Sequence, residues 1–414
     1  MAMSQRTYVI VGASLAGAKA AEELRNSGFD GRVVLIGTEL ERPYERPPLS
    51  KDYLRGESPR EKTLVHEQDF YPAHEIELLL GTTVTAIDPG AGRVTLDGTR
   101  ELAFDRLLLC TGAEPRRLRV PGAELDGIHY LRSLADCDAL CERLDAGGRL
   151  AVVGAGWIGS EVAASARQRG LEVTVIDPLP LPNERIFGRE IGEFYRDLHV
   201  RHGVRLLLGE GVEAFEGDGA VRRVRTTSGA TVECDAAVVG VGVVPRVGLA
   251  ADAALLVDNG VVVNQQLRTT AAKVFAAGDV ANAWHPFYRR RIRVEHWANA
   301  LNQAPAAARA MLDQDVSYDR IPYFFSDQYE VGMEYSGYAT EWDRVVFRGD
   351  RDAGEFIAFW LHRDRVVAGM NVNVWDVNEH VQALIHSREP VDAAALADTD
   401  TPLESLAGEV TAEV

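Results

Sequence analysis

The chain has 414 residues, of which 46% are hydrophobic and 26% are charged. These are ordinary values for a globular protein and exclude an intrinsically disordered chain. At roughly 150 residues per domain, the length predicts two or three domains. The 44 basic and 62 acidic residues give a formal net charge of -18. Binding to nucleic acid or to an anionic membrane is not expected, because both need a surface rich in lysine and arginine.

The four cysteines (Cys110, Cys137, Cys141 and Cys234) are too few and too scattered for a secreted disulfide framework. Cys137 and Cys141 would share one face of a helix and could begin a metal site. No second Cys/His pair at ligand spacing accompanies them, so we expect packing residues and no metal. The N-terminus has no signal-peptide pattern, and the longest apolar run, residues 236–245, is shorter than the roughly 20 residues of a membrane helix. A cytoplasmic location is predicted.

The first predicted element pair surrounds a glycine-rich turn. A strand at residues 8–11 leads into Gly12-Ala-Ser-Leu-Ala-Gly17, then an alanine-rich helix, then a strand at residues 32–36. This order predicts a βαβ unit. Ser14 replaces the middle glycine of the dinucleotide fingerprint, but serine is small and adds a hydroxyl donor, so approach of a pyrophosphate is still expected. The second strand ends without an acid; Glu39, or the backbone of Thr38, is the expected ribose contact.

The same pattern recurs about 140 residues later. A strand at residues 150–153 leads into Gly154-Ala-Gly156-Trp-Ile-Gly159, a helix, and a strand at residues 173–176 that ends at Asp177. The three glycines permit a tight turn, close approach of a pyrophosphate, and close packing of helix on strand. Asp177 would bind the ribose hydroxyls of NAD and repel the extra phosphate of NADP. Two such units predict two nucleotide ligands.

Beyond about residue 320 the chain is rich in aromatic residues with alternating strand character, and residues 378–386 look helical. This pattern of alternating aromatic residues followed by a helix predicts a small α+β domain built on an antiparallel sheet. The last two dozen residues are alanine-rich and acidic and predict a weak helix or a frayed tail.

In chain order these motifs resemble the FAD-dependent NADH:ferredoxin reductases of bacterial oxygenase systems, within the pyridine nucleotide-disulfide oxidoreductase superfamily. The resemblance covers about residues 6–390. The motifs that carry it are Gly12 to Gly17, Arg46-Pro-Pro-Leu-Ser-Lys51, Cys110-Thr-Gly-Ala113, Gly154 to Gly159 with Glu161, Gly240-Val-Gly-Val-Val-Pro245, Val274-Phe-Ala-Ala-Gly-Asp279, Glu295-His-Trp-Ala-Asn299 and Tyr323-Phe-Phe-Ser-Asp-Gln-Tyr329.

The resemblance implies an α/β fold with two Rossmann-like FAD/NAD(P)-binding domains and a C-terminal α+β domain. The implied division is an FAD domain at residues 5–112 and 243–320, an NADH domain at 113–242, a C-terminal domain at 321–390, and an acidic tail at 391–414.

The resemblance also implies the cofactor contacts. For FAD these are Gly12, Ser14, Ala16 and Gly17 at the pyrophosphate, Thr38 and Glu39 at the adenosine ribose, Arg46 and Lys51 on the flavin side, Asp279 at a ribityl hydroxyl, Trp297 at the flavin or nicotinamide ring, and Val84, Thr111, Gly112 and Arg132 elsewhere along the cofactor. For NADH they are Gly154, Gly156, Ile158, Gly159, Glu161, Asp177 and Gly242. Lys51, Glu161 and Trp297 are the expected catalytic residues.

Several of these residues have a simpler alternative reading. Two prolines before Lys51 make its position rigid, and a cation there would favour reduction of the flavin. Glu161, near the start of its helix, could pair with Lys51, or the two could be a solvated charge and an acid favoured by the helix dipole. Asp279 could also cap a helix, which is compatible with ribityl binding. Trp297 could be a core residue.

Residues 40–60 contain no cysteine, although flavoenzymes of similar architecture that perform thiol chemistry carry theirs at this place. Thiol–disulfide chemistry there has no nucleophile, so electrons are expected to leave the flavin directly. The expected activity is hydride transfer from NADH to FAD and single-electron transfer to a 2Fe-2S ferredoxin that supplies a haem-thiolate monooxygenase or a Rieske dioxygenase. The alternatives are reduction of rubredoxin, a quinone or another small acceptor, and a non-enzymatic, redox-responsive flavoprotein binding module.

Four arginines fall within five residues: Arg289, Arg290, Arg291 and Arg293. They are either a solvated loop or a docking site for a small acidic redox protein, whose opposite potential would speed encounter. Arg309 and Arg344 could extend such a patch. A monomer is expected, because the C-terminal domain has no clear symmetric apolar interface.

Overall fold

The computed structural model describes residues 6–407. The chain divides into two compact units that are each built from separate stretches. The first unit comprises Met1–Pro47, Pro59–Glu114 and Val243–Arg320, and the second comprises Pro48–Ser58, Pro115–Gly242 and Ile321–Val414.

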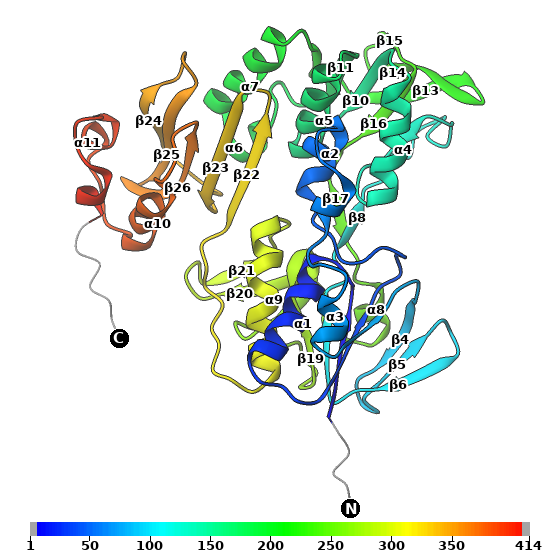
Figure 1. Ribbon diagram of the computed structural model, residues 1–414. Helices are drawn as coiled ribbons and strands as arrows, with labels where there is room; N and C mark the ends of the chain where they lie inside the picture. The colour runs from blue at the N-terminus through cyan, green and yellow to red at the C-terminus, as the bar shows by residue number, and fades with distance from the viewer. Residues whose placement is uncertain (1–5, 408–414) are drawn as a thin grey trace, which may run out of the picture. The chain divides into compact units, whose positions relative to one another are not determined.

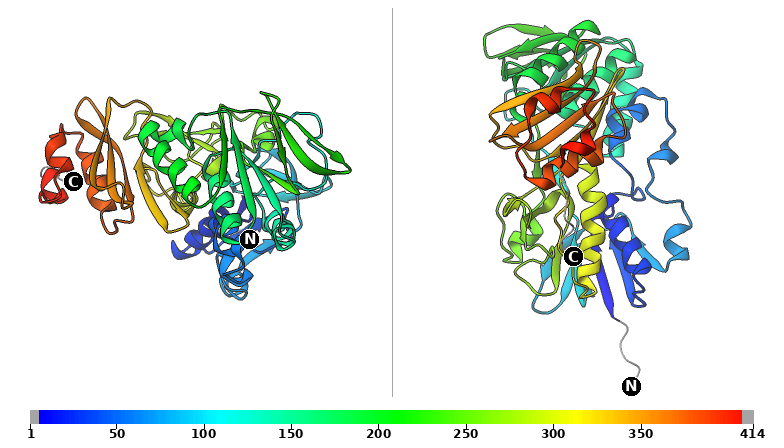
Figure 2. Two further views of the ribbon diagram at one scale, coloured as in Figure 1. Left: turned by 90° about the horizontal axis from the view of Figure 1, so that it is seen from above. Right: turned by 90° about the vertical axis from the view of Figure 1, so that its left-hand side faces the viewer.

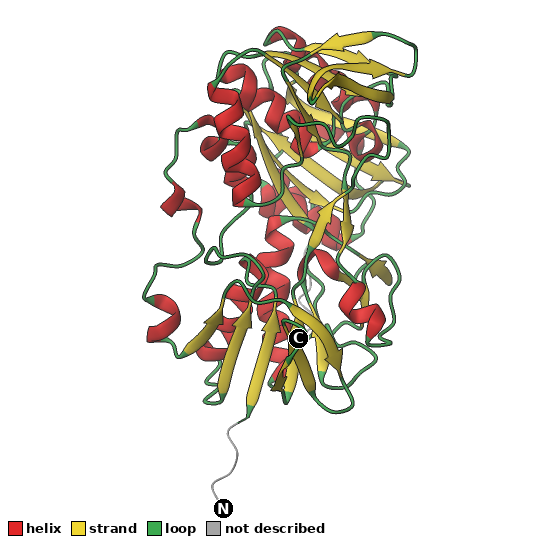
Figure 3. Cartoon of the chain, turned by 90° about the vertical axis from the view of Figure 1, so that its right-hand side faces the viewer, coloured by secondary structure: helices red, strands yellow, loops and turns green. Residues whose placement is uncertain are grey.

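The first unit is organised by a five-stranded parallel sheet of the order β19-β7-β1-β2-β3 (Figure 3). Its central strands are runs of branched apolar residues whose side chains are buried, the pattern expected of a sheet covered on both faces. The strands are β1 (Thr7–Val11), β2 (Arg32–Ile36), β3 (Ile76–Leu79), β7 (Arg106–Leu109) and β19 (Val274–Ala276).

Two helices of the first unit lie side by side, α1 (Leu15–Asn26) and α9 (Trp297–Met311) (Figure 1). Arg309 of α9 bonds Glu23 of α1, and alanines of both helices enter one hydrophobic core with the parallel sheet. The remaining elements of the unit are η2 (Arg60–Thr63), α3 (Phe70–Ala73), α8 (Gly248–Asp252), η3 (Gly278–Val280), the antiparallel strands β4 (Val84–Asp88), β5 (Arg93–Leu96) and β6 (Arg100–Ala103), and the sheet of β18 (Val261–Val263), β20 (Ala281–His285) and β21 (Arg290–Ile292).

The second unit repeats this plan with the parallel sheet β12-β11-β10-β16-β9. In both sheets the strand before the glycine turn is central, and the strand after the turn is its neighbour, as in a Rossmann fold. The strands are β9 (Ile128–His129), β10 (Arg149–Val153), β11 (Glu172–Asp177), β12 (Arg205–Leu208) and β16 (Ala236–Val239), with the helices α4 (Leu134–Asp145), α5 (Trp157–Gln168), α6 (Glu184–Phe187) and α7 (Arg189–Arg201).

A second sheet of this unit is antiparallel, in the order β22-β23-β26-β25-β24 (Figure 2). Its apolar residues share a core with α6 and α7, in which Trp360 donates a hydrogen bond to the carbonyl of Phe187. The strands are β22 (Tyr323–Gln328), β23 (Val331–Gly337), β24 (Arg344–Asp350), β25 (Glu355–His362) and β26 (Arg365–Val372), followed by the helix α10 (Asn378–Ser387). Smaller elements of the second unit are η1 (Pro47–Ser50), α2 (Asp52–Arg55), and the three-stranded sheet of β13 (Val212–Asp218), β14 (Ala220–Thr226) and β15 (Thr231–Glu233). The strand β17 (Val243–Pro245), which belongs to the first unit, pairs with β8 (Ala113–Pro115), which runs to the boundary of that unit.

The segment predicted as an acidic tail contains ordered structure up to Ala407. The helix α11 (Ala393–Ala397) begins at Asp392, whose side chain accepts a hydrogen bond from the amide of Ala394. Leu396 in α11 and Leu403 in η4 (Leu403–Leu406) are buried, because both elements pack on the antiparallel sheet domain. Residues 408–414 of the predicted tail lie outside the described residues.

The predicted fold class is confirmed: two Rossmann-like sheets and a C-terminal antiparallel sheet are present. The division into three domains and a tail stays a prediction, since the second parallel sheet and the antiparallel sheet fall in one unit. None of the helices among residues 6–407 has the length and apolar character that crossing a membrane requires.

Candidate functional site

The first glycine of each fingerprint occupies a conformation that other residues rarely adopt. Gly12 has φ +117°, and a Cβ there would lie 2.1 Å from the carbonyl oxygen of Cys110. Gly154 has φ +103°, and its Cβ would lie 2.4 Å from the carbonyl oxygen of Gly240. Both turns therefore require glycine for the same two reasons.

The last glycine of each fingerprint lets the helix approach its own turn. A Cβ on Gly17 would meet the carbonyl oxygen of Gly12 at 2.0 Å, and one on Gly159 would meet that of Gly154 at 1.9 Å. The two turns are thus built alike, which matches the close helix–strand packing that the fingerprint serves.

The middle positions, Ser14 and Gly156, are the N-cap residues of α1 and α5. Beyond the immediate chain neighbours and the helix backbone, no atom of the described residues lies within 4 Å of a Cβ built on Gly156. Neither helix has a side-chain cap at its N-cap residue in the described chain. The first-turn amides of both helices therefore fit a pyrophosphate, which supports the expected FAD and NADH sites.

Three of the predicted FAD residues come together in the first unit. Arg46 Nη1 donates to Ser14 Oγ at 3.2 Å, and Arg46 Nη2 lies 3.8 Å from Glu39 Oε1. Tyr44 donates to Glu39 Oε2 at 2.5 Å. Arg46 therefore joins the glycine turn to the end of β2, where the sequence predicted the pyrophosphate and the ribose.

Thr38, which follows β2, lies beside the residue that precedes Val84. The hydroxyl of Thr83, which directly precedes β4, lies 3.5 Å from that of Thr38, and Val84 is the buried first residue of β4. Thr111 donates to the carbonyl of Arg246 at 2.9 Å, and Gly112 accepts from the amide of Arg246 at 2.9 Å.

The turn that carries Asp279 lies beside the first glycine turn. A Cβ on Gly278 would be 3.4 Å from the Cβ of Ala16, and the amide of Gly278 donates to Gln303 Oε1 at 2.8 Å. Arg293 donates to the carbonyl of Asp279 at 3.2 Å. The structure thus brings Asp279 to the same end of the parallel sheet as Ala16.

Trp297 is the first residue of α9. Burial raises the pKa of the Glu45 carboxyl, and the proximity of Trp297 acts in the opposite direction. Desolvation of the partly buried, adjacent His296 lowers its pKa to about 4. Trp297 therefore lies beside a carboxyl group at the start of α9.

Asp177 in the second unit is buried at the end of β11. Its Oδ2 accepts from the amide of Ala155 at 2.6 Å, and its Oδ1 accepts from the amide of Leu179 at 2.7 Å. The carboxylate therefore fastens the glycine turn to the strand end. A carboxylate accepts more than two hydrogen bonds, so this role is compatible with ribose binding.

The second unit also holds a buried ion pair, between Lys51 and Glu161. Lys51 Nζ lies 2.7 Å from Glu161 Oε2, and both side chains are at least nine-tenths buried. Ser50 donates to the same oxygen at 2.5 Å, and Ser326 donates to Glu161 Oε1 at 2.7 Å. The aromatic ring of Phe325 has its centroid 5.5 Å from Lys51 Nζ. A buried carboxylate with three donors is the arrangement that a charge needs in order to remain ionised inside a protein.

Sequence reasoning missed both serines of this network and the residues behind them. Ser165 of α5 donates to the carbonyl of Ser50 at 2.7 Å, and Gln328 donates to Ser326 at 3.3 Å. Ser326 was part of a motif that carried the resemblance, but nothing in the sequence linked it to Glu161.

Three further predicted residues of the second unit lie before α4, within α5 and directly before β17. Arg132 precedes α4, and its amide donates to Asp136 at 3.2 Å. Ile158 is an exposed apolar residue in the first turn of α5, and Gly242 has φ +94°. The predicted FAD set is therefore distributed over both units, with Lys51 and Arg132 in the second.

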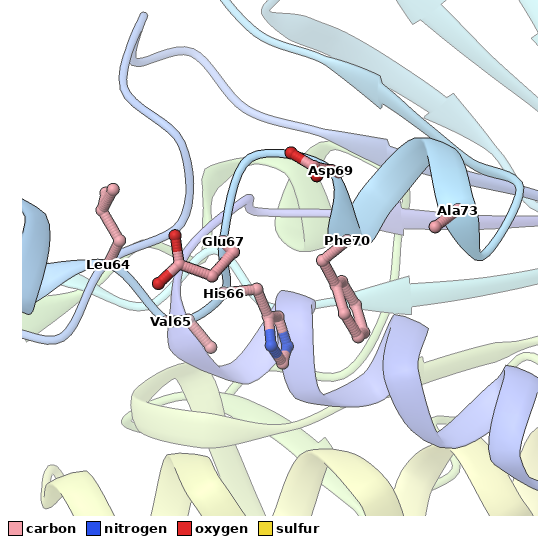
Figure 4. Close-up of a pocket in the computed structure, with 7 residues that line it drawn as sticks. All are labelled: Leu64, Val65, His66, Glu67, Asp69, Phe70 and Ala73. Atoms are coloured by element: carbon pink, nitrogen blue, oxygen red, sulfur yellow. The ribbon is translucent and has the colours of Figure 1, made fainter.

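A separate hollow lies in the first unit and contains none of the predicted site residues (Figure 4). His66 stacks on Phe70 there, with ring centroids 3.7 Å apart. The hollow is lined by Leu64, Val65, His66, Glu67, Asp69, Phe70 and Ala73. Among residues 6–407 there is also no group of three His, Cys, Asp or Glu side chains that could hold a metal ion.

Known proteins share both parts of this architecture. Residues 6–304 match the family described as pyridine nucleotide-disulphide oxidoreductase, and residues 323–407 match the family described as reductase C-terminal. Rhodocoxin reductase of Rhodococcus erythropolis is 38% identical over 399 residues, which are 96% of this chain and 93% of that protein. The ferredoxin–NAD(+) reductase component of the anthranilate 1,2-dioxygenase system of Burkholderia cepacia is 39% identical over 411 residues, which are 98% of this chain and all of that protein.

A solved structure extends this likeness to three dimensions. The crystal structure of the covalent putidaredoxin reductase–putidaredoxin complex matches with a TM-score of 0.93 and 36% identity, over 97% of this chain and 98% of that chain. Both the sequence and the fold are therefore shared along nearly the whole length. The chain belongs to the pyridine nucleotide-disulphide oxidoreductase family, among the ferredoxin reductases that use FAD and NAD(H).

Proposed function

We propose that this protein takes a hydride from NADH onto FAD and passes the electrons singly to a small 2Fe-2S ferredoxin that supplies a haem-thiolate monooxygenase or a Rieske dioxygenase. Relatives over nearly the whole chain are named as reductases of a dioxygenase system and of rhodocoxin, and another forms a complex with putidaredoxin. FAD, when bound, supplies the conversion between two-electron and one-electron transfer.

We assign the cofactor contacts to residues whose geometry suits them. The amides at the start of α1, together with Ser14, would bind the FAD pyrophosphate. Because Arg46 bonds Ser14 and approaches Glu39, it would act at the pyrophosphate and ribose rather than on the flavin side. The open side of Gly156 and the buried carboxylate of Asp177 would receive NADH.

The observation that carries the proposal is the buried network around Glu161. Glu161 accepts three hydrogen bonds and so holds the ammonium group of Lys51 at a fixed point. A cation fixed in a site of low dielectric favours negative charge on a nearby redox group, and the phenyl ring of Phe325 helps to exclude water from it. Lys51, positioned by Glu161, would therefore tune electron transfer through its charge.

The sequence between residues 40 and 60 carries no thiol. Lys51 and its flanking residues occupy this place in the chain, so a cysteine cannot relay electrons there. Direct transfer from the cofactor to a separate carrier is the remaining route.

We propose that the hairpin of β20 and β21 receives the ferredoxin. Arg289, Arg290 and Arg291 are exposed, and Trp284, directly opposite Arg291 in the hairpin, is 39% exposed. Directly opposed residues share one face of a sheet, so this face combines positive charge with an aromatic anchor. Two of the four guanidinium groups are held by the fold: Arg291 donates to the carbonyls of Val263 and Asn282, and Arg293 pairs with Glu295 and bonds the backbone of Asp279.

We propose a cytoplasmic monomer. The four cysteines are unpaired in the described chain, which suits a reducing compartment.

Rapid mixing of the FAD-loaded protein with NADH, NADPH and a 2Fe-2S ferredoxin tests the proposal. We expect bleaching of the flavin absorbance by NADH much faster than by NADPH, followed by reduction of the ferredoxin. Slow bleaching by NADH, or transfer to rubredoxin or a quinone but not to any ferredoxin, would contradict it.

A further inference from the structure

The helix α4 of the second unit carries two thiols on one face, four residues apart. Cys137 is completely buried and its Sγ lies 3.2 Å from the carbonyl oxygen of Leu49. Cys141 is partly exposed and its Sγ lies 3.7 Å from the carbonyl oxygen of Leu54. Both thiols therefore contact the short segment that carries Lys51.

A guanidinium group completes this cluster. Arg169, the C-cap residue of α5, donates through Nη1 to the carbonyl of Leu54 at 2.9 Å and forms an ion pair with Asp145 at the end of α4. Arg169 and Cys141 thus share the Leu54 carbonyl as a hydrogen-bond acceptor. A cation beside a partly exposed thiol is the environment that favours a reactive thiolate.

The four cysteines of the chain differ in how their surroundings shift the pKa of the thiol. A hydrogen bond from Cys137, aided by Arg169, lowers the pKa of the Cys141 thiol although burial opposes the shift. The interaction of its thiol with Cys141, together with burial, raises the pKa of Cys137. Burial raises the pKa of Cys234 to about 12 and also raises that of Cys110.

The single hydrogen of the Cys137 thiol connects Cys141 with the Lys51 segment. In the structure this hydrogen is donated to the Leu49 carbonyl, and the sulfur of Cys141, one turn further along α4, would compete for it only once it is ionised. Ionisation of Cys141 makes its sulfur the stronger acceptor. The Leu49 carbonyl, two residues before Lys51, then loses its hydrogen bond.

We propose that the thiol of Cys141 is oxidised by peroxides and reacts with other soft electrophiles. Modification of Cys141 then loosens the segment that carries Lys51. This site lies apart from the cofactor contacts assigned above and does not depend on the proposed electron transfer. With hydrogen peroxide, the Cys141 thiolate attacks one oxygen, an S–O bond forms as the O–O bond breaks, and hydroxide leaves and takes up a proton as water. Sulfur is oxidised by two electrons to the sulfenic acid, and the peroxide is reduced by two.

The packing of α4 against α2 explains how oxidation of Cys141 would affect Lys51. The sulfenic oxygen must be accommodated where Cys141 faces the carbonyls of Tyr53 and Leu54 in α2. Tyr53 also donates to Asp138 of α4 at 2.6 Å, so α2 and α4 are fastened together at this point. An added atom between them strains α2, which begins directly after Lys51.

Alkylation of the native, FAD-loaded protein with iodoacetamide at pH 7, followed by peptide mass spectrometry, tests the reactive site. We expect Cys141 to be modified about tenfold faster than Cys110, Cys137 or Cys234, which serve as controls within the same molecule. Cys137→Ala, which removes the thiol donor, and Arg169→Gln should each slow modification of Cys141. Arg169→Lys keeps the positive charge and should restore part of the rate. This variant distinguishes loss of the charge from misfolding as the cause of the slower reaction in Arg169→Gln. Modification of Cys234 as fast as Cys141, or no dependence on residue 169, would overturn the proposal.

Hydrogen peroxide followed by a sulfenic-acid trap tests the redox step. We expect the trapped label on Cys141, together with faster amide hydrogen exchange in residues 48–58. Cys141→Ser exposed to the same peroxide is the control and should show neither change. Label on Cys110 or Cys234 instead, or a labelled Cys141 with unchanged exchange in residues 48–58, would refute the inference.

Discussion

Lys51 and Glu161 come from positions 110 residues apart in the chain, yet their Nζ and Oε2 atoms lie 2.7 Å apart, and both side chains are almost fully buried. The charge of each residue is thus compensated mainly by the other. Two serine hydroxyls occupy further acceptor positions of Glu161, so the carboxylate is strongly anchored. Such a pair is sensitive to loss of one member, because the remaining charge stays buried.

Glu161→Gln should destabilise the second unit by about 3 kcal/mol, since it leaves the Lys51 ammonium without a counter-charge. Flavin reduction at saturating NADH should also slow. Urea unfolding measures the first effect, and stopped-flow absorbance measures the second. The double variant Lys51→Met with Glu161→Gln removes both charges and should recover much of the stability but not the rate. Equal stability of single and double variants would contradict the assigned pairing.

Ser326→Ala removes one donor to Glu161 Oε1 while leaving the ion pair intact. A hydrogen bond to a buried charged group contributes about 2 kcal/mol, and the unfolding free energy should fall by about this amount. If Ser326 positions Glu161, flavin reduction at saturating NADH should slow without a change in the Kd for NADH. The exposed Ser317→Ala is the matched control and should change neither quantity. A changed Kd at an unchanged rate would show a different role.

The middle and last glycines of the second fingerprint should respond differently to the same added methyl group. Gly156→Ala has open space around its Cβ and an ordinary φ of -78°, so stability should stay the same or rise by about 0.5 kcal/mol. Its affinity for NADH should nevertheless fall by about tenfold, because the methyl group occupies the pyrophosphate approach. Gly159→Ala places a Cβ 1.9 Å from the carbonyl oxygen of Gly154 and should cost about 3 kcal/mol. Isothermal titration and urea unfolding separate the two effects; unchanged NADH affinity in Gly156→Ala would remove Gly156 from the site.

A buried histidine predicts how stability depends on pH. Burial lowers the pKa of His199 to about 4 from its ordinary value of 6.5. Between these values the unfolded chain binds a proton that the folded chain does not, so the contribution is complete above pH 6.5 and is lost as the pH falls towards 4.

His199→Asn should flatten this part of the profile, by up to about 1.4 kcal/mol per pH unit between pH 6 and 4.5. Urea unfolding at several pH values measures the slope. The exposed His386→Asn serves as the control and should leave the slope as it is. An unchanged slope in His199→Asn would mean that the histidine is protonated in the folded protein as readily as in the unfolded chain.

The sequence predicted those parts of the site whose chemistry is local to a short stretch of backbone. Both glycine turns, with the Asp177 strand end, follow from spacing alone, because each residue acts on neighbours a few positions away. Ser326 could not be predicted in the same way, since it reaches Glu161 from 165 residues further along the chain. The arginine run shows a second limit, because neighbouring arginines look equivalent in the sequence. In the fold Arg293 pairs with Glu295, whereas Arg289 is exposed. Trp284 had no charge pattern or motif to distinguish it.

The hairpin of β20 and β21 offers a test of ferredoxin docking. Arg289→Glu combined with Arg291→Glu should lower the association rate with an acidic ferredoxin by about tenfold at low salt and reduce its dependence on ionic strength, because opposite potentials steer the encounter. Trp284→Ala should instead raise the dissociation rate, since it removes an aromatic anchor while leaving the charge. Stopped-flow ferredoxin reduction across a salt series measures both. The exposed Arg119→Glu is the control for a charge change elsewhere on the protein. If it slows association as much as the hairpin variant does, net charge rather than the hairpin governs the encounter.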